Sequence, residues 1–478
     1  MIARKTGKTH KTRQILSPLG ALGIACGLAG AFAGYEAQAQ NVVITNAMVA
    51  TGDGSDPIPN ATVVVSNGRV VSAGAAGPVP AGATVIDGTG QWVTPGLFAA
   101  ATTLGLWDVG AVSESNDQAA SGSPFSAALD VAPALNPASQ HVAVSRAGGI
   151  TRASVYSRPS SSIFGGQGAI VDLGSDATML MRPRAFQMIA MGEGGARLGG
   201  GSRTGAHALL RNALREAGQY GDDSQLVGRA AAPERDVSGD DLPIDPRLID
   251  NRTERASDTL LTRFDAAALV PALRGQQPLY VMVERAADIR EILALKREFA
   301  SLDLVLVGAS EGWLVARDIA AAGVPVIARA LDDLPSSFEQ LAATQSNVGR
   351  MIDAGVTVAI GGLDGGTDGQ PRSITQFAGN LVALGKVPGA AGLSWGQAFA
   401  AISATPAAIA GYEGRLGVLT PGAMGDLVLW SGDPLELDSA PTRIFIDGVE
   451  QPLINHQTRL RDRYRDLDES ALPKAYDW

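Results

Sequence analysis

The sequence is poor in the residues that build disulfides and soft-metal centres. Its 478 residues include one cysteine, Cys26, and four histidines, and aromatic side chains make up 5%. A single cysteine cannot form a disulfide within the chain. A basic surplus is also missing, because 38 Lys+Arg stand against 48 Asp+Glu, so we expect no nucleic-acid partner. The hydrophobic fraction of 45% is that of an ordinary globular protein.

Residues 1–39 have the three parts of a secretory signal peptide. Five basic residues come first, an apolar stretch runs from Ile15 to Gly34, and Ala37-Gln38-Ala39 fits a cleavage site. The glycines and the cleavage site argue against an uncleaved membrane anchor, and Gly23 lies where a lipoprotein needs a leucine-type residue. We therefore expect an exported protein, periplasmic or secreted, without a stable membrane anchor after cleavage. The mature chain would keep 33 Lys+Arg and 47 Asp+Glu and lose Cys26.

Both ends of the mature chain are rich in β-strand patterns. Residues 40–95 contain alternating runs and the hairpin signal Asn67-Gly68. Residues 418–478 contain strand-like segments at 427–430 and 443–446. Because chain termini often lie close together, the two segments are expected to pair in one β-sandwich.

The middle of the chain, residues 96–417, alternates short apolar runs with helical patterns, which predicts a parallel sheet with helical crossovers. No G-x-G-x-x-G follows an early strand, which argues against a dinucleotide-binding sheet and leaves an open sheet or a closed barrel. Residues 192–258 are polar and predict a surface excursion with one helix at 207–217. Strands are expected at 278–284, 302–307, 323–328 and 355–361, and helices at 286–299, 312–322, 336–354 and 373–384.

Two segments at the domain joins carry recognisable motifs. Residues 91–105 read QWVTPGLFAAATTLG. This segment resembles the one in the amidohydrolase superfamily, in particular its imidazolonepropionase-like branch, in which a strand leads into P-G-[LIF]-[IV]-D-x-H-x-H-L-G. Residues 404–407 and 415–428 look like its TPA…GxLxPGxxADL signature, and Pro371-Arg372-Ser373 also resembles it. The resemblance implies a (β/α)8 TIM-type barrel carrying a β-sandwich built from the N- and C-terminal segments.

The same resemblance implies a metal site that this sequence does not supply. The family's paired first-strand histidines correspond to Ala101 and Thr103, and a methyl group cannot ligate a metal. The later positions fall on 282–284, 307–308 and Leu363, and the mature chain has three histidines, His141, His207 and His456. We therefore expect no zinc site, and we interpret the three histidines as solvated or capping residues.

Four carboxylates remain as candidate catalytic residues. Asp108, Glu284, Glu311 and Asp364 each follow an expected strand and could face the barrel mouth, where TIM-type barrels carry their sites. Together they could bind a hard divalent cation or act as acid and base, or they could be separate loop carboxylates paired with arginines. No cofactor is predicted beyond that cation. Trp107 and Trp313 could form an aromatic wall for a ligand, or they could pack under loops. Residues 165–168 could bring backbone N–H groups to a substrate, or they could form a tight turn into a strand.

By resemblance, the activity is hydrolysis of carbon–nitrogen bonds in cyclic amide or peptide-like compounds, without the usual zinc. The alternative is an inactive exported protein that binds a small molecule in the barrel mouth, or a partner subunit of an active amidohydrolase. A homo-oligomer also remains open, because the sequence does not reveal the oligomeric state.

Overall fold

A computed structural model describes residues 40–226, except Ala76, Pro78 and Ala177, together with residues 260–361 and 370–465. These residues belong to one compact unit, residues 39–478. Leu363 and Asp364 lie outside the described residues, as do the expected signal peptide and most of the second half of the 192–258 excursion. In the part of the chain that is described, no helix has the length and hydrophobicity needed to cross a membrane.

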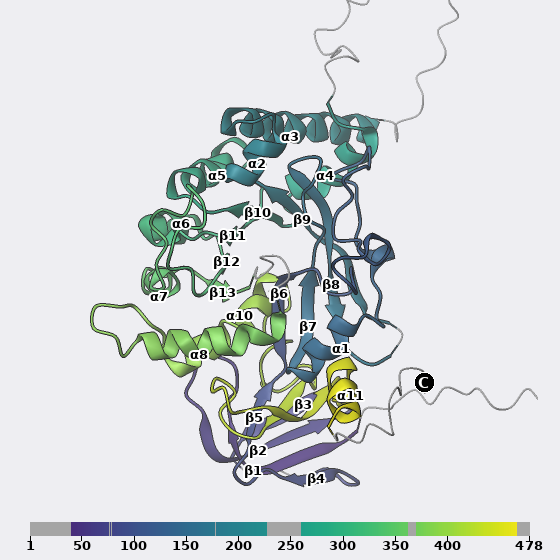
Figure 1. The fold of residues 1–478 in the computed structure, drawn as a ribbon, viewed down its shortest axis with the longest axis vertical. Helices are drawn as coiled ribbons and strands as arrows, with labels where there is room; N and C mark the ends of the chain where they lie inside the picture. Colours follow the sequence, from purple (N-terminus) through teal and green to yellow (C-terminus); the bar gives the residue numbers. More distant parts are fainter. Residues whose placement is uncertain are drawn as a thin grey trace, which may run out of the picture. The chain divides into compact units, whose positions relative to one another are not determined.

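Eight strands form a barrel-like sheet in the middle of this unit (Figure 1). Neighbours in sequence are neighbours in the sheet, and a bridge between Ala100 and Gly361 joins the first strand to the end of the last. The expected TIM-type barrel is confirmed. Its strands are β6 (Leu97–Thr102), β7 (Ile150–Val155), β8 (Phe164–Asp172), β9 (Leu180–Ala190), β10 (Leu279–Val283), β11 (Leu304–Gly308), β12 (Val326–Ala328) and β13 (Val358–Ile360).

One strand of the barrel, β8, runs against its neighbours. The links before and after β8 are too short for a helical crossover, so they can join only antiparallel strands. The glycines at 165–168, interpreted above as a cradle or a turn, lie inside β8. A side chain on Gly168 would collide with the ring of Phe186, which stacks on Tyr280 at 4.1 Å in the apolar barrel interior.

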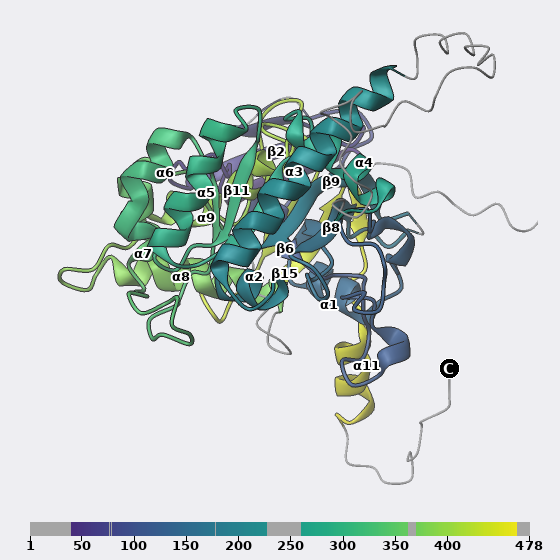
Figure 2. The same ribbon diagram turned by 90° about the horizontal axis from the view of Figure 1, so that it is seen from above.

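Helices cover the outer face of the barrel (Figures 1 and 2). The expected helices at 286–299, 312–322 and 373–384 are present, with the second beginning as a 3-10 turn, η5 (Gly312–Val315). The barrel helices are α1 (Gln140–Ala147), α2 (Gly192–Leu198), α3 (Arg203–Leu226), α4 (Arg263–Leu273), α5 (Ala286–Glu298), α6 (Ala316–Ala322), α7 (Asn347–Asp353) and α8 (Ile374–Leu384); α9 (Trp395–Ala400) and α10 (Ala404–Ile409) follow.

Two helical expectations need correction. The helix expected at 336–354 is present only as α7, residues 347–353. Residues 336–342 use their polar groups in tertiary contacts instead. The backbone N–H of Ala342, for example, donates to Glu311. The polar excursion is more ordered than expected at its start, since α2 and α3 together span residues 192–226 apart from a short break. The polar residues of this segment lie on the solvent-facing side of the helices, and the other side of the helices packs on the barrel.

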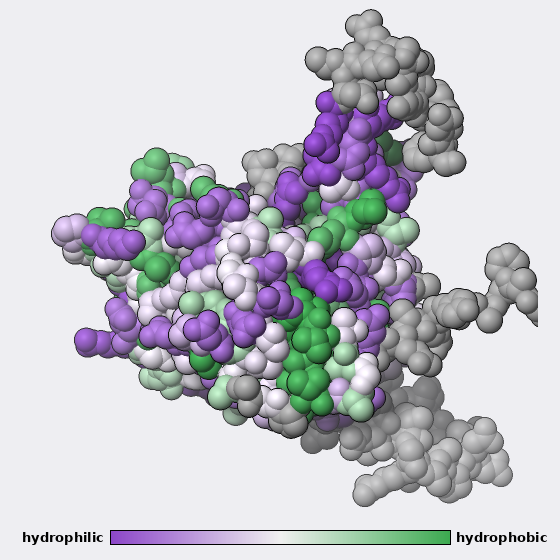
Figure 3. All heavy atoms as spheres, turned by 90° about the horizontal axis from the view of Figure 1, so that it is seen from below, coloured by the Kyte–Doolittle hydropathy of each residue, from purple (hydrophilic) through white to green (hydrophobic). Residues whose placement is uncertain are grey.

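The two ends of the chain meet in a second sheet, as expected. The order β16-β15-β14-β5-β1-β2-β3 places β14 antiparallel to β5, with Leu427 opposite Pro95 and Trp430 opposite Trp92; β4 pairs with β1. Figure 3, seen from below, shows a largely polar surface crossed by a hydrophobic strip. The strands are β1 (Val42–Val49), β2 (Ile58–Ser66), β3 (Arg69–Gly74), β4 (Thr84–Asp87), β5 (Trp92–Pro95), β14 (Leu427–Trp430), β15 (Pro441–Ile446) and β16 (Val449–Gln451), and α11 (His456–Arg463) follows them.

A buried arginine, Arg152 on β7, links the barrel to this second sheet. It is 1% exposed and donates to both carboxylate oxygens of Asp426, at 2.7 and 2.9 Å. It also pairs with Asp172 at the end of β8 and with Asp447 in the β15–β16 turn. Three carboxylates share one guanidinium, and burial raises the pKa of Asp172 to about 6, although Arg152 opposes the shift.

Arg152→Met should therefore destabilise the protein strongly, by about 3–5 kcal/mol, because it leaves buried carboxylates without their cation. The free energy of urea unfolding at pH 7 measures this. Arg184→Met is the matched control, since Arg184 pairs with Asp130 while 66% exposed and should change stability little. Equal effects of the two substitutions would contradict the structural role assigned to Arg152.

Candidate active site at the barrel mouth

The barrel mouth lies where the seven parallel strands end, the position at which TIM-type barrels carry their sites. Its described part begins at the end of β6 and continues through the residues that follow β10, β11 and β12. The floor is apolar: Met282, Val307 and Ile327 belong to the cluster of side chains that fills the barrel interior. Polar chemistry at the mouth therefore depends on the residues just beyond the strands.

The first-strand positions of the family's histidines hold no ligand here. Ala101 is 1% exposed, and its backbone N–H donates to Ser154 at 2.8 Å. Its φ is +52°, which a non-glycine residue rarely adopts. Thr103 is 2% exposed, and its hydroxyl lies 3.2 Å from the Gln118 side-chain oxygen, to which it donates. Ala101 is thus closed off by packing, whereas Thr103 holds a hydrogen bond within the protein and lines a small pocket beside β6.

A hydrogen-bonded group joins the ends of the next strands. Glu284 follows β10, and its Oε2 accepts hydrogen bonds from the backbone N–H and the hydroxyl of Ser310, at 2.9 and 2.7 Å. The Ser310 hydroxyl also lies 2.9 Å from Asp332 Oδ2, and Gln340 Nε2 donates to it at 3.1 Å. Arg329 pairs with Asp332 at 3.4 Å. Residues that follow three successive strands therefore meet around one serine.

This group can hold an extra proton. The Ser310 hydroxyl has one hydrogen to donate, yet it contacts two carboxylates, so both short contacts are favourable hydrogen bonds when one carboxyl is protonated. Burial raises the pKa of Glu284 to about 6, against the hydrogen bonds from Ser310. Glu284 can therefore exchange a proton near neutral pH.

The other two described carboxylate candidates have structural roles. Asp108 accepts from Asn136 and from the first backbone N–H of α1. Glu311 is 7% exposed and accepts from the backbone N–H groups of Ala286 and Ala342. Their contacts support the interpretation of separate loop carboxylates for these two, with backbone and amide groups rather than arginines as partners. Asp364 lies outside the described residues.

The tryptophans divide between the two interpretations. Trp313 donates its indole N–H to the Ala342 carbonyl at 2.8 Å and lies under the Arg350 guanidinium, so it packs beneath a loop. Trp107 instead stacks on His141, with ring centroids 3.8 Å apart, and both line a pocket beside β6. His141 is therefore half-buried and stacked, and the interpretation as a solvated residue is wrong for it.

The described residues do not fit the zinc that the fold family implies. Within the described ranges, no three His, Cys, Asp or Glu side chains lie close enough together to hold an ion. The donors that do meet at the mouth are two carboxylates, an amide and a hydroxyl, all engaged with one another. Oxygen donors of this kind suit a hard cation better than zinc.

Sequence reasoning missed three of the four residues in the central group. It selected Glu284 because a strand precedes it, but Ser310, Asp332 and Gln340 carry no motif. Gln340 fell inside an expected helix. A signal was available only for Ser310, which comes two residues after the β11 strand and would share the mouth with Glu284 in any parallel barrel.

Comparisons with known proteins bear on the fold and on part of the sequence. Residues 245–451 match the family model described as amidohydrolase family. The amidohydrolase tasK of Hapsidospora irregularis is 38% identical over 60 residues, which are 13% of this chain and 6% of that protein. The chain thus matches only a small part of that relative.

Among solved structures, an amidohydrolase from Thermotoga maritima is similar, with a TM-score of 0.71 and 23% identity over 86% of this chain and 99% of that one. A weaker likeness, with a TM-score of 0.49 and 15% identity, is to phenylurea hydrolase B, over 86% of this chain and 96% of that one. The likeness to the Thermotoga maritima structure shows the fold, and the family model matches fewer than half of the residues of this chain.

Glu284→Gln should change how stability depends on pH. Because the folded pKa of about 6 lies above the ordinary 4.5, ionisation of Glu284 opposes folding. The free energy of unfolding of the wild type should therefore fall by about 1–2 kcal/mol as the pH rises from 4.5 through 6. Glu284→Gln should not show this fall, because glutamine does not ionise. Urea unfolding at several pH values between 4 and 7.5 measures this, with the exposed Glu413→Gln as control. Parallel profiles for the wild type and Glu284→Gln would contradict the assignment.

Proposed function

We propose that this protein is an exported, zinc-independent member of the amidohydrolase superfamily that acts on amide- or peptide-like small molecules at the barrel mouth. The family match and the fold support hydrolysis of a carbon–nitrogen bond. The observation that carries the zinc-independent form is the pair Ala101 and Thr103. Both are buried, and they offer a methyl group and a single hydroxyl where the family's paired ligands would project.

Glu284 is the residue best placed to supply acid–base chemistry. Above about pH 6 its carboxylate can take a proton from a water molecule as that water attacks an amide carbonyl, and the resulting carboxylic acid can return the proton to the leaving nitrogen. Ser310 fixes the carboxyl by two hydrogen bonds, and Asp332 and Gln340 fix Ser310. Activity that depends on this base should rise as the pH increases through 6.

A second function, binding without hydrolysis, is favoured by one observation. The polar groups of the mouth are already paired with one another, because Ser310 contacts both the half-buried Glu284 and Asp332. A site of this kind can recognise a ligand at its rim without activating water. A role as partner subunit of an active amidohydrolase belongs to the same class, because neither role needs catalytic residues.

One assay distinguishes these functions. Mature protein is incubated with hydantoin, dihydrouracil, N-acetyl amino acids and dipeptides, with and without a chelator, and free amine or ring opening is measured. The proposal predicts turnover that the chelator leaves unchanged and that Glu284→Gln reduces at least about a hundredfold, the usual contribution of a general base. Glu311→Gln is the control, since Glu311 binds only backbone groups in the described structure.

The remaining outcomes are equally informative. Turnover abolished by the chelator and restored by zinc would contradict a zinc-independent site. Saturable binding of one of these compounds without turnover would replace hydrolysis by binding. Recovery of the protein in a stable complex with an active amidohydrolase, with no turnover of its own, would favour the partner role.

A further inference from the structure

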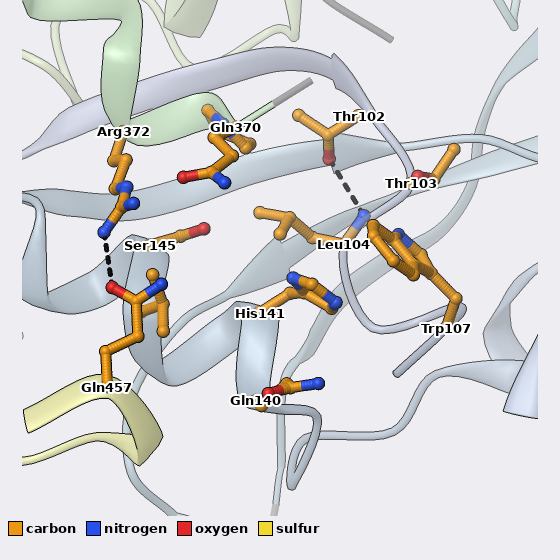
Figure 4. A pocket seen from close by; sticks show the side chains of 12 residues that line it. Thr102, Thr103, Leu104, Trp107, Gln140, His141, Ser145, Gln370, Arg372 and Gln457 are labelled. Atoms are coloured by element: carbon orange, nitrogen blue, oxygen red, sulfur yellow. Dashed lines mark hydrogen bonds between the residues drawn. The ribbon is translucent and has the colours of Figure 1, made fainter. Parts of the chain in front are cut away.

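A separate small pocket lies beside the barrel, where the first turns of α1 and α11 meet the 3-10 turn η6 (Pro371–Ser373). Its volume is about 80 Å³, and Figure 4 shows the side chains that surround it. Its upper wall is the end of β6 and the residues after it, so it borders the mouth but does not include Glu284. The side chains that matter are those of Trp107, His141, Ser145, Arg372 and Gln457.

The lining is positively charged in an acidic protein. Arg372 carries this charge, and the described lining contains no carboxylate. Arg372 donates one hydrogen bond to the neutral Gln457 side chain at 2.8 Å and forms no ion pair with any residue in the described ranges. Arginine has five N–H donors, so several remain for a bound molecule.

A serine hydroxyl faces the pocket beside that arginine. Ser145 is 3% exposed as a residue, and Figure 4 shows its hydroxyl directed into the pocket, on the side facing Leu104. A hydroxyl in this position can donate a hydrogen bond to a bound molecule.

The aromatic side of the pocket is rigid. The rings of Trp107 and His141 stack at 3.8 Å, and His141 Nε2 lies 3.0 Å from the Asp108 carbonyl. A carbonyl can only accept a hydrogen bond, so Nε2 carries the proton. This bond holds the histidine ring against the tryptophan and leaves a flat wall suited to a short carbon chain.

We propose that this pocket binds the carboxylate of a small organic acid. Arg372 would hold the carboxylate, the Ser145 hydroxyl would donate to the same group, and the Trp107–His141 wall would contact the carbon chain. One guanidinium with neutral neighbours suits a single negative charge better than a doubly charged phosphate. A wider groove of about 700 Å³ shares Arg372 and Gln457, so a longer acid can extend outward. This inference does not depend on hydrolysis at the mouth.

The test is calorimetric titration of the mature protein with sodium propionate, with propionamide as the uncharged counterpart, at constant ionic strength. Saturable one-to-one binding of propionate is expected, with at least about tenfold weaker binding of propionamide. Arg372→Gln should weaken propionate binding at least about tenfold, since charged hydrogen bonds contribute most. Ser145→Ala should weaken it by a smaller factor, and Arg184→Gln is the control.

Three outcomes would overturn the proposal: no saturable binding of propionate to the wild type, equal binding of propionate and propionamide, or tighter binding of inorganic phosphate. Thermal melting shows whether Arg372→Gln remains folded. If that variant unfolds, Ser145→Ala decides, because it removes only one oxygen from the pocket lining. Unchanged propionate binding by Ser145→Ala would then contradict the site.

Discussion

The buried guanidinium of Arg152 connects the two parts of this protein. It comes from the second strand of the barrel and binds Asp426 and Asp447, which belong to the second sheet. The segment 425–428, which resembles a family signature, therefore has a structural explanation: its aspartate positions the sheet against the barrel. Because β5 of that sheet runs directly into β6, the same contact fixes where the first barrel strand begins and where its end reaches the mouth.

Local patterns were sufficient to predict most of the barrel's second half and the pairing of the two chain ends. The expected strand at 278–284 and helix at 286–299 are β10 and α5, because both have strong periodicity and clear boundaries. The antiparallel strand β8 was not predictable in this way. Its direction depends on short links and on Gly168 making room for Phe186, which are tertiary effects. The helix expected at 336–354 was wrong for the same reason, since Glu311 takes a backbone N–H within it.

The candidate site was likewise predictable only in part from the sequence. Position relative to a strand identified Glu284, but it also selected Asp108 and Glu311, which bind backbone groups and support loops. What separates them is the surrounding chemistry: Glu284 shares the Ser310 hydroxyl with a second carboxylate, and its pKa is raised to about 6. Serine and glutamine residues without a motif cannot be recognised as partners until the fold brings them together.

The central proposal is that this protein works without zinc at the mouth of its barrel. It rests on Ala101 and Thr103 at the first strand, and on a mouth whose described carboxylates are hydrogen-bonded to protein groups. The most direct measurement is elemental analysis of the purified mature protein after dialysis against a chelator, followed by incubation with zinc and a second dialysis against buffer. The account predicts far less than one zinc per chain at both stages. One tightly held zinc per chain would contradict it.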